Sequence, residues 1–170
     1  MGVSIVFVDV DGVLNNQFTT ESCDGFIGID DKYVANLRKI VDSTEDCRIV
    51  LSSTWRLGFT RYGDSLEHHR EYLDNKLAKQ GLKIFDVTPD LSRNGESRGC
   101  EIHTWLEEHE DLGIDFWVVL DDEYFYDFGY YDVSPHWVAT DFYSENGSLN
   151  DKMTQEAIEI LHGGVASDFR

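Results

Sequence analysis

Apolar and polar positions along the chain follow two patterns, which alternate from the first residues to the last. Continuous apolar runs, as in strands covered on both faces, predict strands at Ser4–Asp9, Cys47–Leu51, Leu82–Val87, Asp115–Leu120 and His136–Ala139. Apolar residues at helical spacing predict helices from Asp30 or Asp31 to about Asp42, and over Ser65–Gln80, Arg98–Glu108 and Lys152–Leu161. This alternation favours an α/β fold, a three-layer Rossmann-like sandwich around a mostly parallel five-stranded sheet.

The segments between the predicted elements are short. Gly12–Gly28 has no clean periodicity and carries polar and glycine residues, so we interpret it as a loop or small flap. Pro89–Gly95 also has the composition of a loop. No linker and no repeat separates the elements, and no room remains for a large cap. We therefore expect a single domain over residues 1–170 with minimal or no cap.

The net charge of −19 is the outlying property of the composition. Such a surface repels the phosphate backbone of nucleic acids, so it disfavours long DNA or RNA as a partner without excluding a local basic patch. No apolar run is long enough for a bilayer, so we expect no membrane partner. Three cysteines without CxxC spacing favour a reducing, cytoplasmic location. The sequence gives no indication of oligomeric state.

Two carboxylates stand one residue apart where the first predicted strand ends. Side chains alternate along an extended chain, so Asp9 and Asp11 point to one side, and Gly12 lets the backbone turn directly after them. Like charges held this close require a cation, a shared proton or an electrophilic substrate. The pattern is typical of a phosphoryl-transfer site.

Further polar residues follow the other predicted strands. Ser52 and Ser53 come after the second strand, Asp121 and Asp122 end the fourth, and Arg98 opens the helix between them. Ligands of open parallel sheets bind beyond the carboxyl ends of the strands. If the first, second and fourth strands are neighbours, these residues converge on one pocket.

The four segments, in this order, resemble the motifs of the haloacid dehalogenase-like (HAD) superfamily. They are Asp9–Leu14, Arg48–Ser53, Ser97–Ile102 and Phe116–Asp122. Three stretches are also similar to a subgroup of small, nearly capless HAD domains found among RNA-repair-type proteins. These are Asp9–Asn15, Ser52–Arg56 (with Thr54 as an extra residue) and Arg98–Leu106.

The resemblance implies a Mg²⁺-dependent phosphatase that forms an aspartyl-phosphate. Asp9 would be the nucleophile, and Asp11 would protonate the leaving oxygen and later activate water. Ser52 and Arg98 would bind the transferring phosphate. Asp121 and Asp122 would hold Mg²⁺ with Asp9 and the backbone carbonyl of Asp11. A nucleotide or the end phosphate of a nucleic acid is the first candidate substrate.

Several assignments remain open at this level. Ser53 is an alternative to Ser52, and Arg93 to Arg98. Gly12 and Arg56 are candidates for substrate binding, although a surface salt bridge is an equal alternative for Arg56. The aromatic stretch Glu123–Tyr131 either walls the pocket or, as we favour, packs on the sheet edge. The alternative function is a non-catalytic HAD-like regulatory domain that binds metal or phosphate, and a structural or interaction protein is a third hypothesis.

Overall fold

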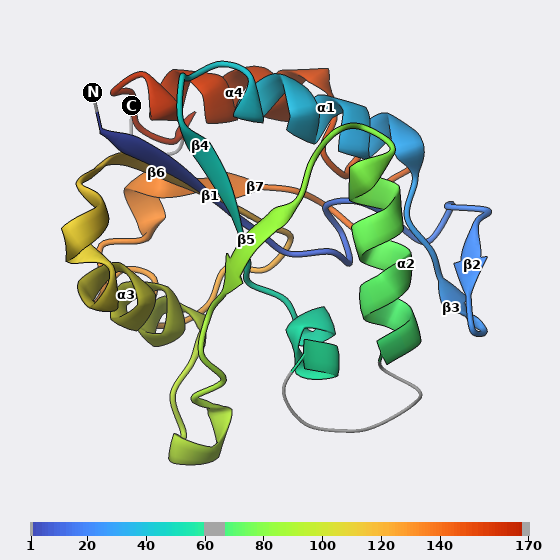
Figure 1. Ribbon diagram of the computed structural model, residues 1–170, viewed down its shortest axis with the longest axis horizontal. Helices are drawn as coiled ribbons and strands as arrows, with labels where there is room; N and C mark the ends of the chain where they lie inside the picture. Colours follow the sequence, from blue (N-terminus) through green and yellow to red (C-terminus); the bar gives the residue numbers. More distant parts are fainter. Residues whose placement is uncertain (1, 60–66, 168–170) are drawn as a thin grey trace.

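A five-stranded parallel sheet of order β5–β4–β1–β6–β7 lies at the centre of the protein (Figure 1). The computed structural model describes residues 2–59 and 67–167. The strands are β1 (Val3–Val8), β4 (Cys47–Leu51), β5 (Ile84–Val87), β6 (Ile114–Asp121) and β7 (Trp137–Ala139). All six residues of the central strand β1 are buried. The predicted α/β fold with a parallel sheet is confirmed, and the predicted strand limits differ from the observed ones by at most two residues.

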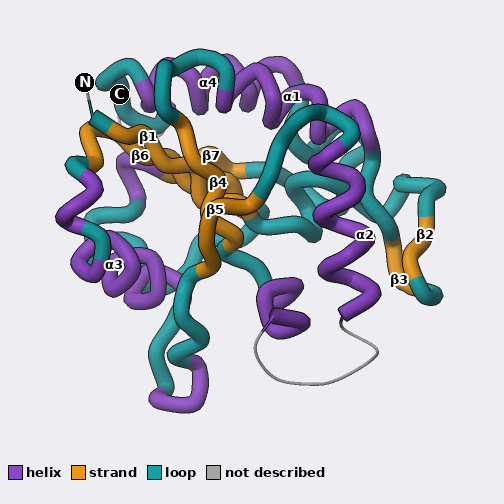
Figure 2. Tube along the Cα trace, viewed as in Figure 1, coloured by secondary structure: helices purple, strands orange, loops and turns teal. Residues whose placement is uncertain are grey.

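Helices cover both faces of the sheet (Figure 2). They are α1 (Asp31–Val41), α2 (Glu67–Ala78), α3 (Arg98–Glu108) and α4 (Asp151–Leu161). Short 3₁₀ helices lie at Thr54–Phe59, Ser92–Asn94, Glu110–Leu112 and Ser134–His136. The Asp30 side chain caps α1 by accepting from Lys32 N–H, which settles the choice between the two predicted caps. The predicted start of the second helix at Ser65 lies outside the described residues.

Alternate residues of β1 supply the two halves of the apolar core. Val6 and Val8 pack with the helices α1, α2 and α4, whereas Ile5 and Phe7 pack with α3 on the other face. The rings of Phe7 and Trp105 meet edge to face, with 5.5 Å between centroids. The three-layer arrangement therefore follows directly from the period of two in the central strand.

The aromatic stretch after β6 completes the α3 face. Phe128 and Val133 are fully buried among the residues that pack on this face, whereas Tyr126 and Tyr130 are exposed. Packing on the sheet, the role that the sequence favoured, is thus observed for Phe128. The apolar side chain closes a sheet face that α3 alone does not cover.

The Gly12–Gly28 segment contains a small antiparallel hairpin of β2 (Ser22–Cys23) and β3 (Phe26–Ile27). Its stem is tied to α2, because the Tyr72 hydroxyl accepts from Ile29 N–H and hydrogen-bonds Glu21, each at 3.0 Å. Lys76, itself buried, pairs with Glu21 and with Asp31. The hairpin and α2 therefore share one polar junction. Within residues 2–59 and 67–167, no helix has the length and apolar character to cross a membrane.

Candidate active site

The carboxyl ends of β1, β4 and β6 lie side by side. Val8 pairs with Leu51 on one side and with Leu120 on the other. The residues that follow, Asp9, Ser52 and Asp121, therefore stand next to one another at the same edge of the sheet. The predicted convergence of the first, second and fourth strands is confirmed.

Three carboxylates gather at this edge. Ligand oxygens of Asp9, Asp121 and Asp122 all lie within 4.8 Å of one another. Asp121 is 1% exposed, and the Asp9 side chain is 13% exposed. Carboxylate oxygens in such a cluster are the hard ligands that Mg²⁺ prefers. The donor set fits a divalent cation.

Burial shifts the protonation of these acids. It raises the pKa of Asp121 well above its usual range, and the negative charge of Asp9 adds to this effect. Burial also raises the pKa of Asp9 to about 6, although the Arg98 charge and a hydrogen bond from Ser53 oppose the shift. Nearby positive charge is therefore required to keep the whole cluster ionised at neutral pH.

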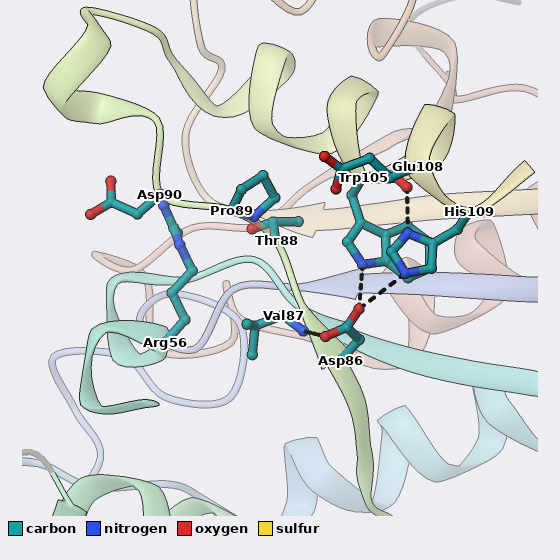
Figure 3. A pocket seen from close by; sticks show the side chains of 9 residues that line it. All are labelled: Arg56, Asp86, Val87, Thr88, Pro89, Asp90, Trp105, Glu108 and His109. Carbon is teal, nitrogen blue, oxygen red and sulfur yellow. Dashed lines mark hydrogen bonds and ion pairs between the residues drawn. The ribbon is translucent and has the colours of Figure 1, made fainter. Parts of the chain in front are cut away.

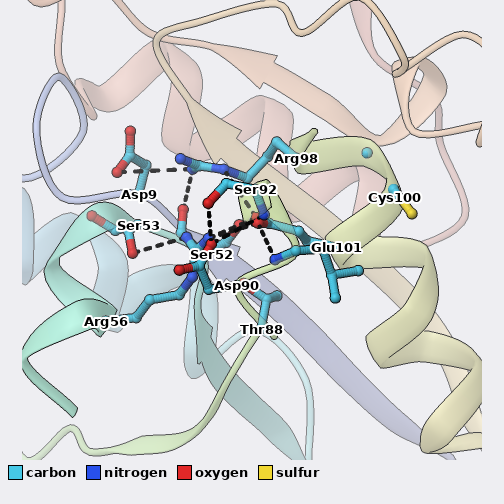
Figure 4. Close-up of polar contacts among 12 residues, drawn as sticks. Asp9, Ser52, Ser53, Arg56, Thr88, Asp90, Ser92, Arg98, Cys100 and Glu101 are labelled. Carbon is cyan, nitrogen blue, oxygen red and sulfur yellow. Dashed lines mark hydrogen bonds and ion pairs between the residues drawn. The ribbon is translucent and has the colours of Figure 1, made fainter. Parts of the chain in front are cut away.

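Arg98 supplies positive charge at the cluster. Its Nη1 donates to Asp121 Oδ2 at 2.9 Å. The same nitrogen donates to the Ser52 carbonyl and lies 4.0 Å from Asp9 Oδ1 (Figure 4). The Phe125 ring lies 4.9 Å from the guanidinium carbon. Arg98 is 8% exposed, whereas its alternative Arg93 is exposed. Of the basic residues considered from the sequence, the structure brings Arg98 to the carboxylates.

Asp127 holds the helix that carries Arg98. The two Asp127 oxygens accept from Gly99 N–H at 3.0 Å and Cys100 N–H at 2.9 Å, and the Ser97 side chain makes no capping hydrogen bond. A carboxylate at a helix N-terminus accepts hydrogen bonds from N–H groups that have no partner within the helix, and its negative charge interacts favourably with the helix dipole. Sequence reasoning did not single out Asp127, because a cap supplied from 28 positions away leaves no local pattern.

The two candidate serines play different parts. The Ser53 side chain acts on Asp9 by lowering its pKa, and its hydroxyl accepts from Trp55 N–H at 3.2 Å. The Ser52 hydroxyl is buried and has no hydrogen-bond partner among the described residues, while the Ser52 carbonyl accepts from Arg98. The side chain next to the proposed nucleophile is thus that of Ser53.

Asp11 is held from two sides. Its Oδ1 accepts from Asn15 Nδ2 at 2.9 Å, and its Oδ2 accepts from the Trp55 indole N–H at 3.1 Å. Asn15 also accepts from Gly12 N–H at 3.1 Å and donates to the Gly28 carbonyl at 2.9 Å. No role at Asp11 was predicted for these two side chains, although both stand inside motifs that the sequence analysis singled out.

Gly12 turns the chain beside the carboxylates. Its φ of +84° lies in the left-handed region, and a Cβ there would come within 2.3 Å of the Asp122 side chain. The Gly12 N–H is occupied by Asn15. Glycine is therefore needed at position 12 for the left-handed backbone and for the close approach of Asp122. Contact between Gly12 and substrate stays a prediction.

Arg56 is in an ion pair, but not at the surface. Its Nη2 donates to both Glu101 oxygens at 2.8 Å, its Nη1 donates to the Ser53 carbonyl at 3.0 Å, and both side chains are at most 6% exposed. The predicted surface location of the salt bridge is wrong, because α3 and the turn after β4 enclose the pair. Substrate binding by Arg56 stays a prediction.

A pocket of about 270 Å³ lies next to this ion pair, lined by Arg56, by β5 and the loop after it, and by α3 (Figure 3). In its wall, the Trp105 indole N–H donates to Asp86 Oδ2 at 2.8 Å. His109 stacks on Trp105 and lies 3.3 Å from the same Asp86 oxygen. These side chains already satisfy one another.

The sheet order and the acids at its carboxyl edge define a HAD-like domain, from a superfamily of phosphatase-type hydrolases. A family model described as "HAD domain in Swiss Army Knife RNA repair proteins" matches residues 5–145. The chain belongs to this family. No curated protein sequence matches it.

Proposed function

We propose that the protein is a Mg²⁺-dependent phosphatase that hydrolyses phosphomonoesters through an aspartyl-phosphate on Asp9. The observation that carries the proposal is the meeting of Asp9, Asp121 and Asp122 within 4.8 Å beside the Arg98 guanidinium. A single domain over residues 1–170 and a cytoplasmic location are parts of the same proposal.

In the first step, an Asp9 oxygen attacks phosphorus and the bond to the leaving oxygen breaks. Val10 N–H donates to Asp9 Oδ1 at 2.8 Å, which orients the carboxylate. Asp11 transfers its proton to the leaving oxygen, so the alcohol departs neutral. Arg98 offsets the charge that gathers on the phosphoryl oxygens, and the Ser53 hydroxyl donates to one of them.

In the second step, Asp11 takes a proton from water, and the resulting hydroxide oxygen attacks phosphorus. The bond to Asp9 breaks, phosphate is released and the Asp9 carboxylate is restored. The same carboxyl group thus gives a proton in one step and accepts one in the next.

Asp9, Asp121 and Asp122 would hold the cation, with the backbone carbonyl of Asp11 as a further ligand. Bound Mg²⁺ supplies charge neutralisation and orientation of the phosphate oxygens. Arg98 pairs with Asp9 and Asp121, and its one positive charge does not balance a cluster of three acids, which supports a second cation at this edge.

A nucleotide or a nucleic-acid end phosphate is the substrate class that we propose. The family's description as a domain of RNA repair proteins supports this choice. The net charge of −19 weighs against long polyanions bound along their length, since non-specific binding depends on basic residues. An end phosphate needs only a local contact at the sheet edge.

The test is hydrolysis of p-nitrophenyl phosphate with Mg²⁺, with EDTA, and by the Asp9→Asn variant. Asp111→Asn, which removes an exposed acid on a 3₁₀ helix, is the matched control. We expect turnover only with Mg²⁺, lost in Asp9→Asn and retained in the control. Undiminished turnover in Asp9→Asn would reject the aspartyl-phosphate, and phosphate-analogue binding without turnover across a broad ester panel would favour the non-catalytic alternative.

A further inference from the structure

We propose that Trp55 is a positioning residue for Asp11, in that its indole N–H fixes the carboxyl plane from which the leaving oxygen receives its proton. The inference rests on the proposed phosphatase function and deepens it. It concerns a side chain that binds neither Mg²⁺ nor phosphate directly in that mechanism and acts only through the Asp11 carboxyl group.

Two donors act on Asp11 from different segments. Asn15 Nδ2 binds Oδ1 at 2.9 Å and Trp55 Nε1 binds Oδ2 at 3.1 Å. The terminal torsion of an aspartate is otherwise broad, so a carboxylate held by one oxygen still rotates. With one donor on each oxygen, the plane is defined. Each oxygen keeps a second lone pair, which can carry the proton that is transferred.

Trp55 is itself held rigidly. The residue is 8% exposed, its backbone N–H donates to Ser53 Oγ at 3.2 Å, and its ring meets that of His69 edge to face with 5.2 Å between centroids. A rigid donor loses little conformational freedom when it binds its acceptor. The indole therefore determines where Asp11 lies.

The turn after β4 thus serves two proposed reacting groups at once. Trp55 hydrogen-bonds Asp11, and Ser53, two residues earlier, lowers the pKa of Asp9. Asp9 and Asp11 leave the end of the neighbouring strand β1. The spacing of two residues in one segment matches the spacing of two residues in the other.

Trp55→Phe isolates the indole N–H better than a change at Asn15. Asn15 also binds Gly12 N–H and the Gly28 carbonyl, so its loss would disturb the turn and the hairpin stem. Phenylalanine keeps an aromatic ring against His69 and removes the donor. Trp105→Phe is the matched control, because it deletes an indole N–H bound to a different carboxylate, that of Asp86, which has no part in the proposed mechanism (Figure 3).

The readout is the dependence of kcat/KM on the leaving group. Phenoxide is a poorer leaving group than p-nitrophenoxide, so phenyl phosphate depends more on a proton from Asp11. We expect Trp55→Phe to lower kcat/KM about tenfold for phenyl phosphate and less than about threefold for p-nitrophenyl phosphate, a fraction of the full effect of a general acid. Trp105→Phe should leave the ratio unchanged. A purely structural loss would lower both substrates equally.

A second measurement reports the contact without turnover. In ¹⁵N-labelled protein, the Trp55 indole resonance should move in Asp11→Asn more than those of the other three tryptophans. If wild type hydrolyses both esters and Trp55→Phe lowers both equally or neither, the positioning role is rejected while the phosphatase stands. If wild type hydrolyses neither ester with Mg²⁺, the proposed function fails, and the positioning role fails with it whatever the indole resonance shows.

Discussion

Arg56 donates from one nitrogen to both carboxylate oxygens of Glu101, and the pair is enclosed between the turn after β4 and α3. Glu101 also accepts from Leu91 N–H at 3.1 Å, so the pair joins three segments. Because Arg56 Nη1 also donates to the Ser53 carbonyl at 3.0 Å, the ion pair helps to hold the turn that carries Ser53.

Arg56→Ala should destabilise the fold strongly, since it removes the closer of two arginines from the buried Glu101 carboxylate and leaves only Arg98, at 3.9 Å. Breaking a buried pair from one side costs about 3–5 kcal/mol of unfolding free energy. Urea denaturation measures it. Lys39→Ala, which removes an exposed partner of Asp151, is the control and should cost no more than about 1 kcal/mol. Equal midpoints for the two variants would contradict the structural role of Arg56.

The protonation of Asp9 should couple to stability in the absence of metal. Its pKa rises from 3.8 to about 6 on folding, because burial disfavours the charged form. The folded protein therefore binds the Asp9 proton more tightly than the unfolded chain does. Proton binding stabilises the fold fully below about pH 4, and this stabilisation is lost as the pH rises through about 6. Asp9→Asn stays neutral, so in EDTA it should exceed wild type in unfolding free energy by an amount that grows over this range, to at most about 3 kcal/mol. A difference that shrinks with rising pH would contradict the buried position of Asp9.

Gly12→Ala should cost more than Gly95→Ala. Both glycines have positive φ, +84° and +76°, so each variant suffers the left-handed penalty of about 1–2 kcal/mol. A new methyl group at Gly12 also meets the Asp122 side chain, whereas no described atom lies within 4 Å of the one at Gly95. We expect Mg²⁺ to raise the melting temperature of Gly95→Ala as in wild type, and less in Gly12→Ala. An equal rise in melting temperature with Mg²⁺ in both variants would show that the close packing of Gly12 against Asp122 does not matter for Mg²⁺ binding.

The two serines should differ in function. Ser53→Ala removes a hydroxyl beside Asp9 and should lower kcat/KM tenfold or more, as for a hydrogen bond to a charged group worth about 1.5–3 kcal/mol. Ser52→Ala removes a hydroxyl with no partner among the described residues and keeps the carbonyl that binds Arg98, so its kcat/KM should stay within about twofold. A larger loss of kcat/KM in Ser52→Ala than in Ser53→Ala would indicate that Ser52, and not Ser53, binds the phosphate.

The sheet and the acids at its edge could be predicted because they rest on local signals. The apolar runs of β1 and β6 end in aspartates, and parallel strands bring such ends together. The supports could not be predicted in the same way. Asp127 caps α3, and Glu101 neutralises Arg56, across separations of 27 to 45 positions that no local periodicity encodes. The sequence predicts the Gly12–Gly28 segment only as a loop or small flap. The hairpin within it and its attachment to Tyr72 and Lys76 appear only in the folded chain.

That fixation has a kinetic consequence. A hairpin whose stem is bound to α2 through Tyr72 and a buried lysine cannot swing open alone, because its movement would break those bonds or take the helix with it. The hairpin is therefore expected to stay in place relative to α2 during turnover and not to open and close as a lid. Substrates would be selected by whether their shape fits beside the fixed hairpin. The turnover rate would contain no step in which the hairpin opens.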